Sequence, residues 1–364
     1  MFQWLQQLFS SPGGRPTTDA AAPHPVVQPV PQPAAAPTPP TTPTAPPAMS
    51  SLSFDQRDSI NTTYYNWLFG SDAASELDTS GAEDQVLEAL STILKSQQSG
   101  SALVRRMPGL IPQLLQSLRS DNFSGAQLSR TISSDLVLVA AVIRLANSST
   151  LGYGKRITSV ENAILLIGTE GLRHLITSVA FRPIFDMNSG HYTRTLALRI
   201  WDQSERCAVA NRMLAEEMGL DPFEAFLAGL VQYVGLIVTL RIMDQADKDG
   251  KHLGSEMFCA RLLSDARTLS CSIGREWNLP DSVVTAITEQ AGARKGVQIS
   301  AMGRLLSQSD YLAKVRILAE NGLASDADRA LFKGLSPSAL ACYQKLDAIA
   351  DEDLPIPAPT DPTS

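Results

Sequence analysis

Helix-start signals recur along residues 51–350, whereas the two-residue alternation of a β-strand is nearly absent. Three segments have capping-box spacing, in which a hydroxyl and a carboxylate or amide three residues later satisfy backbone N–H groups of the first turn. They are Ser80–Glu83, Ser124–Gln127 and Thr158–Glu161. Four prolines stand where a first helical turn is expected and the missing N–H costs nothing: Pro108, Pro222, Pro280 and Pro337. These signals predict an all-α fold.

Apolar residues at helical spacing define the expected helices. They cover 54–69, 81–95, 109–119, 125–133, 135–147, 160–167, 170–181, 192–218, 222–243, 253–277, 281–290 and 298–319, followed by two short helices. The stretch Ala225–Leu240 has no formal charge, but its 16 residues are fewer than the ~20 that a bilayer requires. We interpret it as a buried helix and expect no transmembrane segment.

Proline content separates the two ends of the chain from its middle. Of 23 prolines, 13 lie between Pro12 and Pro47 and four between Pro355 and Pro362. Residues 10–48 contain no Leu, Ile, Phe, Tyr or Trp, so they cannot bury enough apolar surface to offset ordering entropy. We therefore predict a docking peptide over 1–10, a disordered linker over 11–52, a helical pre-domain over 53–98, the main domain over 104–316, C-terminal helices over 317–350 and a disordered acidic tail over 351–364.

The first ten residues form an amphipathic pattern. On a helical wheel one side carries Phe2, Trp4, Leu5, Leu8 and Phe9, and three glutamines occupy the other. Because so short a helix is not stable alone in water, we expect this segment to fold when it docks on a partner. The alternative is a frayed end that packs on the domain. A protein groove is favoured over a membrane surface, because the segment has no Lys or Arg for anionic lipid.

Charge and cysteine content exclude several functional classes. The formal charge is −7, of which four acidic residues of the tail carry −4, so nucleic-acid binding is not expected. The cysteines form no C-x-x-C pair, which favours buried thiols in a reducing compartment: Cys207, Cys259, Cys271 and Cys342. No secretory signal is expected, since the first basic residue is Arg15. We expect a cytoplasmic protein.

Several separated motifs resemble one known family. In order, they are Ile143–Ser148, Ala163–Gly168, Trp201–Ser204, Ala225–Gly235, Gly274–Pro280 and Ser309–Leu312. Together they resemble the HDOD domain, a bacterial signalling module related to HD-type phosphohydrolases but generally without their catalytic residues. The resemblance covers about residues 104–315 and implies an all-α bundle in two lobes, with the eroded HD site in the second.

The resemblance also places the HD ligand positions in this chain. The first His corresponds to Gln203, the His-Asp pair to Gln232–Tyr233, and the distal Asp is kept as Asp310. Gln is a poor metal ligand and Tyr is neutral at pH 7, so one ligand of four remains. Glu289–Gln290 replaces the histidine that metal-dependent relatives carry there. We expect no catalytic residue, no catalytic metal and no cofactor.

Other residues of the family signature have structural interpretations. Arg144 and Asn147 end an apolar helix, where they can satisfy carbonyl groups of the next turn. Ser148, Gly168, Trp277 and Pro280 are taken as structural in the same way.

The family resemblance implies a non-enzymatic signal-transduction or regulatory protein that acts as a protein–protein interaction module. Its implied partners are signalling proteins, such as members of two-component or cyclic-di-GMP networks. The alternative is a divergent HD-type phosphohydrolase, or a sensor of a cyclic dinucleotide or (p)ppGpp, that uses the remnant HD cleft. We define this cleft by Gln203, Gln232, Tyr233 and Asp310.

Overall fold

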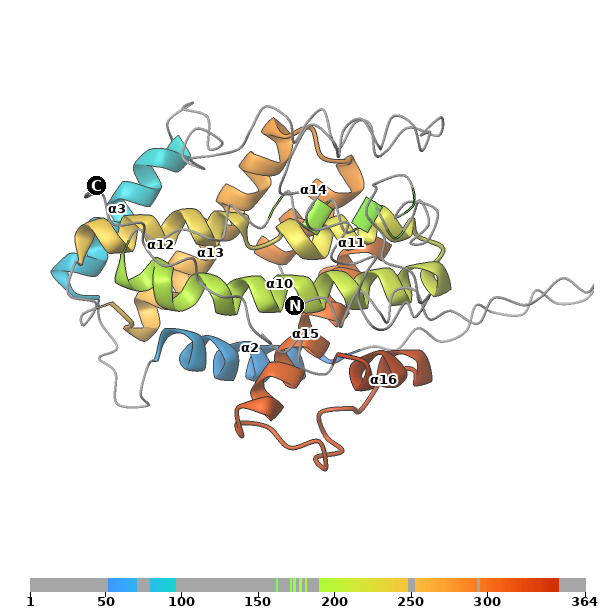
Figure 1. Ribbon diagram of the computed structural model, residues 1–364. Helices are drawn as coiled ribbons and strands as arrows, with labels where there is room; N and C mark the ends of the chain where they lie inside the picture. The colour runs from blue at the N-terminus through green and yellow to red at the C-terminus, as the bar shows by residue number, and fades with distance from the viewer. Residues whose placement is uncertain are drawn as a thin grey trace, which may run out of the picture.

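The structure is a computed structural model. It describes residues 52–70, 79–95, 190–247, 253–292 and 295–346, together with 162, 171, 173, 174, 177, 178 and 181. Every regular element in these ranges is helical (Figure 1), which confirms the predicted all-α fold. The docking peptide, the linker and the acidic tail lie outside the described residues. So do Arg144, Asn147, Ser148 and Gly168.

The helices assemble around one long central element, α10 (His191–Ala215), which packs against α11, α12, α15, α16 and α2 (Figure 1). A short 3₁₀ turn, η1 (Glu216–Met218), continues it. The other described helices are α2 (Phe54–Phe69), α3 (Gly81–Lys95), α11 (Pro222–Val231), α12 (Val234–Ala246), α13 (Glu256–Glu276), α14 (Asp281–Ala291), α15 (Ala301–Glu320) and α16 (Pro337–Gln344).

The start signals read from the sequence work as expected at several of these helices. Ser80 and Glu83 form the reciprocal capping box of α3: Glu83 N–H donates to Ser80 Oγ at 3.3 Å, and Ser80 N–H donates to Glu83 Oε2 at 2.7 Å. Pro222 lies in the first turn of α11 behind the N-cap Asp221. Pro280 differs slightly, because it is the N-cap residue of α14 rather than its first helical residue.

The predicted helix over 222–243 was wrong in one respect: it is two helices, broken at Gln232–Tyr233. Tyr233 has φ −102° and ψ 10°, which leaves the helical conformation. Gly235 approaches α13 so closely that an added Cβ would lie 2.0 Å from the carbonyl oxygen of Ala266, and its N–H donates to Ser270 Oγ at 2.9 Å. The break thus follows from close backbone packing between α12 and α13, which hydrophobic spacing does not reveal.

Within the described residues one stretch, Pro222–Ala246, is long and apolar enough to span a membrane. However, 89% of its most apolar 18-residue window is buried against the rest of the chain. Phe226 and Leu230 are completely buried, for example, and burying such a side chain contributes roughly 1.5–3 kcal/mol. The stretch therefore serves as core, as its length indicated.

The helices of segment 53–98 pack directly on this core. Helix α2 contacts α15 and α10, and α3 contacts α12 and α13. At the other end, residues 321–334 form turns and bends, so α16 is the one helix that follows α15 in the described part of 317–350. The expectation of two short C-terminal helices is corrected to one in this range.

Candidate functional site

Asp310 of α15 lies at the centre of a polar cluster inside the helical bundle. Gln203 Nε2, on α10, donates to Asp310 Oδ1 at 2.6 Å, and the Tyr233 hydroxyl donates to the same oxygen at 2.7 Å. The other carboxylate oxygen, Oδ2, accepts from Lys314 Nζ at 2.7 Å. Three of the four sequence-predicted cleft residues therefore meet in one place, together with a lysine that was not predicted.

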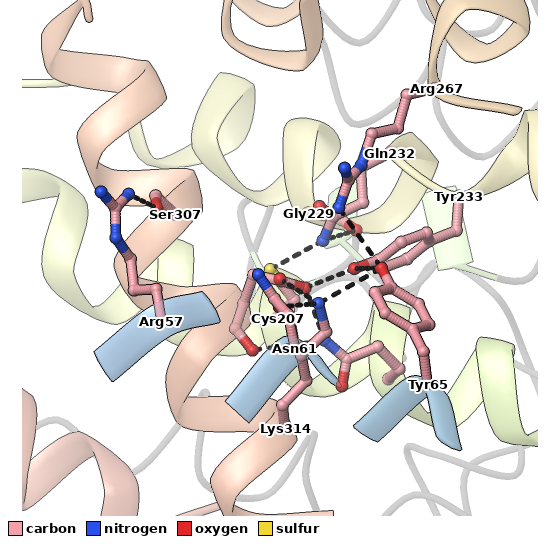
Figure 2. A network of polar contacts seen from close by, with 12 residues as sticks. Arg57, Asn61, Tyr65, Cys207, Gly229, Gln232, Tyr233, Arg267, Ser307 and Lys314 are labelled. Atoms are coloured by element: carbon pink, nitrogen blue, oxygen red, sulfur yellow. Dashed lines mark hydrogen bonds and ion pairs between the residues drawn. The ribbon is translucent and has the colours of Figure 1, made fainter. Parts of the chain in front are cut away.

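Lys314 is the counter-ion of Asp310, and its side chain is fully buried. Besides Asp310, its ammonium group donates to Asn61 Oδ1 at 2.7 Å and to the Tyr65 hydroxyl at 3.3 Å. An ammonium group has three N–H donors, so all of them are used. Nζ also lies 4.6 Å from the ring centroid of Tyr65 and 5.3 Å from that of Tyr64, where the electron-rich ring faces favour a cation. Figure 2 shows how Asn61 and Tyr65 reach this network from α2.

The two tyrosines of the cluster form a directed chain of hydrogen bonds. The hydroxyl oxygens of Tyr65 and Tyr233 are 3.2 Å apart. Because Tyr233 gives its proton to Asp310, Tyr65 must donate to Tyr233. Burial raises the pKa of Tyr233 well above its usual value. Burial alone would also raise the pKa of Tyr65, but the positive charges of Lys314 and Arg267 lower it overall.

Gln232, the fourth predicted residue, turns away from Asp310. Its Nε2 donates to Cys207 Sγ at 3.0 Å and to the carbonyl oxygen of Gly229 at 3.4 Å (Figure 2). Burial raises the pKa of the Cys207 thiol well above its usual value, so this sulfur is a poor nucleophile. Gln232 still lines the same cleft as Tyr233 and Asp310.

The cleft beside this cluster has a volume of about 150 Å³ and lies between α2, α13, α14 and α15. Its lining is largely polar: Arg57 and Asn61 come from α2, Arg267 from α13, Gln290 from α14 and Ser307 from α15. Figure 2 shows Arg57 and Arg267 on different sides of the network. Helix α2 thus supplies part of the cleft wall although it precedes the motifs that carry the family resemblance.

The HDOD domain model matches residues 104–292, slightly more than half of the chain. This chain belongs to the HDOD family. Its fold agrees with that of a candidate metal-dependent phosphohydrolase from Shewanella amazonensis SB2B, with a TM-score of 0.50, 17% identity, and coverage of 73% of this chain and 98% of that chain. A candidate signal transduction protein from Marinobacter aquaeolei VT8 is also similar, with a TM-score of 0.48, 18% identity, and coverage of 82% and 68%.

One curated relative is an uncharacterized protein from Treponema pallidum (strain Nichols), 20% identical over 193 residues. The match covers 50% of this chain but only 37% of the relative. At these identities the solved structures show the HDOD fold alone.

The residues of this HDOD chain do not fit the divalent metal of an HD phosphohydrolase. A metal ion needs lone pairs, whereas the groups that face the Asp310 carboxylate are N–H and O–H donors from Gln203, Tyr233 and Lys314. A metal at Asp310 would also meet the buried ammonium group of Lys314 at short range. Among the described residues, no three or more His, Cys, Asp or Glu side chains gather as a metal-binding group.

Two further site residues predicted from the sequence, Trp277 and Pro280, lie in the described part of the chain. Trp277 is buried, and its ring centroid lies 5.6 Å from that of Phe181. The carbonyl group of Pro280 accepts from Val283 N–H and Val284 N–H at the start of α14. Neither contact involves the cleft.

Residues Glu289 and Gln290 also make contacts within the helical core. Glu289 accepts from Ser300 N–H at 2.8 Å and from Ser300 Oγ at 2.7 Å, and so holds the start of α15. Gln290 donates to the carbonyl oxygen of Gly303 at 3.0 Å.

The motif comparison missed Tyr65 and Lys314 of the polar cluster. It also missed several residues that line the cleft, among them Arg57, Asn61 and Arg267. A signal for Lys314 did exist, because it stands between Ala313 and Val315, four residues after Asp310 on the same helix. The α2 residues carry no comparable local signal, since Asn61 contacts a lysine 253 positions away.

Proposed function

We propose that this chain is a non-catalytic regulatory member of the HDOD family that acts by contact with other proteins. It hydrolyses no phosphoester and holds no catalytic metal. One observation carries the proposal: the buried ammonium group of Lys314 lies 2.7 Å from Asp310, the carboxylate that aligns with the distal metal ligand of HD enzymes. A lysine in that place supplies the positive charge that a metal would supply, but it cannot activate a water molecule as a Lewis acid.

Further support comes from the arrangement around this ion pair. Asn61 and Tyr65 of α2 complete the coordination of the ammonium group, so two helices far apart in the sequence keep it in place. Removing one partner of such a buried pair leaves an uncompensated charge, which costs several kcal/mol. A metal that displaced Lys314 would have to overcome this cost first.

The proposed partners are signalling proteins, such as members of two-component or cyclic-di-GMP networks, as family membership suggests; nucleic acid is not among them. A cytoplasmic location belongs to the same proposal. In its favour, none of the four cysteines forms a disulfide bond in the structure, which suits a reducing compartment. The names of the Shewanella and Marinobacter proteins point to hydrolysis and to signalling respectively, so direct measurement must separate the two functions.

The first experiment compares metal content and hydrolysis in wild type and Asp310→Ala. Protein is purified without chelator and analysed for Mn, Fe, Ni and Zn, then assayed on bis(p-nitrophenyl) phosphate with each metal added. We expect less than stoichiometric metal and no turnover above that of the metal salts, equal in both proteins. About one metal per chain, with activity that Asp310→Ala abolishes, would overturn the proposal.

A second experiment tests whether Lys314 is the obstacle to metal binding. The substitutions Gln203→His, Gln232→His and Tyr233→Asp restore the HD ligands, once with Lys314 and once with Lys314→Ala. We expect Mn²⁺ to bind only to the second protein, as measured by calorimetry. Equal Mn²⁺ affinity in both would remove the central argument.

The interaction itself is tested with defined proteins. Candidate partners are first recovered by a pull-down with the full chain and then purified. Each is titrated against the full chain, a deletion of residues 1–10 and a matched deletion of residues 355–364. We expect saturable binding at a fixed stoichiometry that weakens without residues 1–10 and is unaffected by the tail deletion. Equal affinity for all three would refute the docking role of the N-terminal peptide, and failure of every purified candidate to bind the full chain would refute the interaction role.

A further inference from the structure

Two arginines of the cleft have no carboxylate at ion-pair distance among the described residues. Arg57 donates through Nη1 to Ser307 Oγ, while its Nε is buried without a hydrogen-bond partner. Arg267 makes one hydrogen bond within the described part of the chain, from Nη2 to the Tyr65 hydroxyl at the long distance of 3.5 Å. Neither guanidinium group forms an ion pair with any carboxylate in the described part of the chain.

Arg206 shows how the same chain treats a buried arginine that has only a structural role. Its Nε lies 2.9 Å from Asp202 Oδ1, and its Nη1 lies 2.8 Å from Glu320 Oε1. Burying a guanidinium group without such compensation costs free energy. Consistent with this cost, burial lowers the pKa of Arg57. Burial alone would also lower the pKa of Arg267, but the charges of Tyr65, Tyr233 and Asp310 raise it overall. Neither arginine has the close carboxylate contacts of Arg206, so each has room for an anion from outside the chain.

The charge balance of the cleft supports the same conclusion. Its lining contains two carboxylates, Asp58 and Asp310. The charge of Asp310 is already matched by Lys314, and Asp58 is exposed to solvent, where its field is screened. Two half-buried guanidinium groups thus face one exposed carboxylate, and the cleft keeps an excess of positive charge.

Asn61 is a third donor in the cleft, and its contact with Lys314 sets the orientation of its amide group. Asn61 accepts from Lys314 through Oδ1, so its amide Nδ2 must point elsewhere, and Nδ2 donates to no described group. Asn61 lines the cleft together with Arg57 and Arg267. The cleft thereby combines two forked cations and one amide donor, the groups that recognise a phosphate or carboxylate oxygen.

We propose that this cleft binds an oxyanion of the phosphate class, an inorganic phosphate or one phosphoryl group of a larger molecule, against the wall that Arg57, Arg267 and Asn61 line. The volume of about 150 Å³ matches that of a cavity that admits a molecule the size of benzene. It therefore accommodates one phosphoryl group, and a nucleotide would extend into solvent. This site requires neither catalysis nor a protein partner, so it stands apart from the proposed function.

The test is calorimetric titration of the full chain with sodium phosphate at constant ionic strength, in the presence of EDTA. EDTA removes any metal-mediated phosphate binding, so the result is distinct from that of the hydrolase test. We expect saturable binding, weakened at least about tenfold in Arg57→Gln and in Arg267→Gln, because a charge-assisted hydrogen bond contributes more than one decade of affinity. The matched control is Arg261→Gln, an exposed arginine on the same helix as Arg267, which should bind as wild type does.

Three comparison ligands separate the sources of the anion. Sodium acetate should bind more weakly than phosphate, and a nucleoside diphosphate or a cyclic dinucleotide should bind at the same site, with the same dependence on Arg57 and Arg267. The proposal fails if phosphate has no saturable effect, if acetate binds more tightly, or if all three arginine variants bind equally. If a Gln variant does not fold, Arg57→Lys replaces it, because lysine keeps the charge without the forked geometry. This variant must then broaden the ³¹P resonance of phosphate less than the wild-type protein does.

Discussion

Lys314 Nζ lies 2.7 Å from Asp310 Oδ2, one helical turn away on α15, and its side chain is completely buried. The ammonium group satisfies this oxygen, while Gln203 and Tyr233 donate to the other carboxylate oxygen, Oδ1. The ion pair joins α15 to α2 through Asn61 and Tyr65 and to α10 through Gln203. A substitution in this buried cluster should therefore change the stability of the fold rather than the properties of the protein surface.

The substitution Lys314→Met removes the buried charge and keeps the volume of the side chain. We expect a loss of about 3–5 kcal/mol in the free energy of unfolding, because Asp310 loses its counter-ion inside the core. Urea denaturation followed by circular dichroism measures it. Adding Asp310→Asn should recover part of the loss, and the double-mutant cycle gives the coupling energy.

The matched control is Lys295→Met, which breaks the exposed ion pair of Lys295 with Asp55 at 3.2 Å. That substitution should change stability by less than about 1 kcal/mol. Equal effects of the two lysine substitutions would contradict the assignment of Lys314 as a buried counter-ion.

The free energy of unfolding should depend on pH through Glu83. Its carboxylate accepts from the N–H groups of Ser80, Gly254 and Ser255 and from the Ser255 hydroxyl. Burial alone would raise the pKa of Glu83, but these hydrogen bonds lower it overall. A lowered folded-state pKa means that the stabilisation is complete above the unfolded pKa of about 4.3 and is lost as the pH falls through the folded value.

We therefore expect Glu83→Gln to reduce the free energy of unfolding at pH 7 by about 1–3 kcal/mol, and the difference from wild type to shrink as the pH falls below about 4. Denaturation at pH 7, 5 and 3 measures both effects. Glu88→Gln, an exposed position on the same helix, should have little effect at any pH. A difference that stays constant with pH would disagree with the lowered pKa of Glu83.

Gly235→Ala tests the close packing that breaks the helix at Gln232–Tyr233. The added Cβ would lie 2.0 Å from the Ala266 carbonyl oxygen and 2.6 Å from the Ser270 backbone nitrogen, so α12 and α13 must move apart. Overpacking of this kind costs about 1–3 kcal/mol or more, and thermal denaturation should detect it.

Gly274→Ala, within α13, is the control for that measurement. Its nearest contact is the Cδ1 atom of Leu279 at 3.4 Å, an ordinary van der Waals distance, and alanine favours a helix over glycine by about 0.5–1 kcal/mol. This variant should be as stable as wild type or more so. A destabilised Gly274→Ala together with an unchanged Gly235→Ala would show that the packing of α12 on α13 is described wrongly.

The four cysteines should differ sharply in reactivity. Cys207, Cys271 and Cys342 are buried, whereas Cys259 is partly exposed. Burial raises the pKa of the Cys207 and Cys271 thiols and brings that of Cys342 to about 12, and the thiolate is the reactive form. Titration of the native protein with Ellman's reagent should label Cys259 first, and Cys259→Ser should remove this fast phase. Fast labelling of Cys207 would contradict the burial of this thiol beside Gln232.

Local sequence patterns predicted much of the fold. The bounds of α2 and α3 agree with the predicted 54–69 and 81–95, and the Ser80–Glu83 capping box formed as expected. These features depend on interactions within about four residues, so spacing along the chain contains the information. The break between α11 and α12 was missed because it depends on the approach of Gly235 to α13.

By itself, the sequence determined that the described core is helical, where most of its helices begin, and which side chains stand at Gln203, Gln232, Tyr233 and Asp310. Only the tertiary structure decided what those side chains contact. It turned Gln232 toward Cys207, set the buried Lys314 against Asp310, and placed Arg57 and Arg267 along one cleft. The physical reason is distance along the chain: Asn61 and Lys314 are 253 positions apart, and only the packing of α2 on α15 brings their side chains within a hydrogen bond.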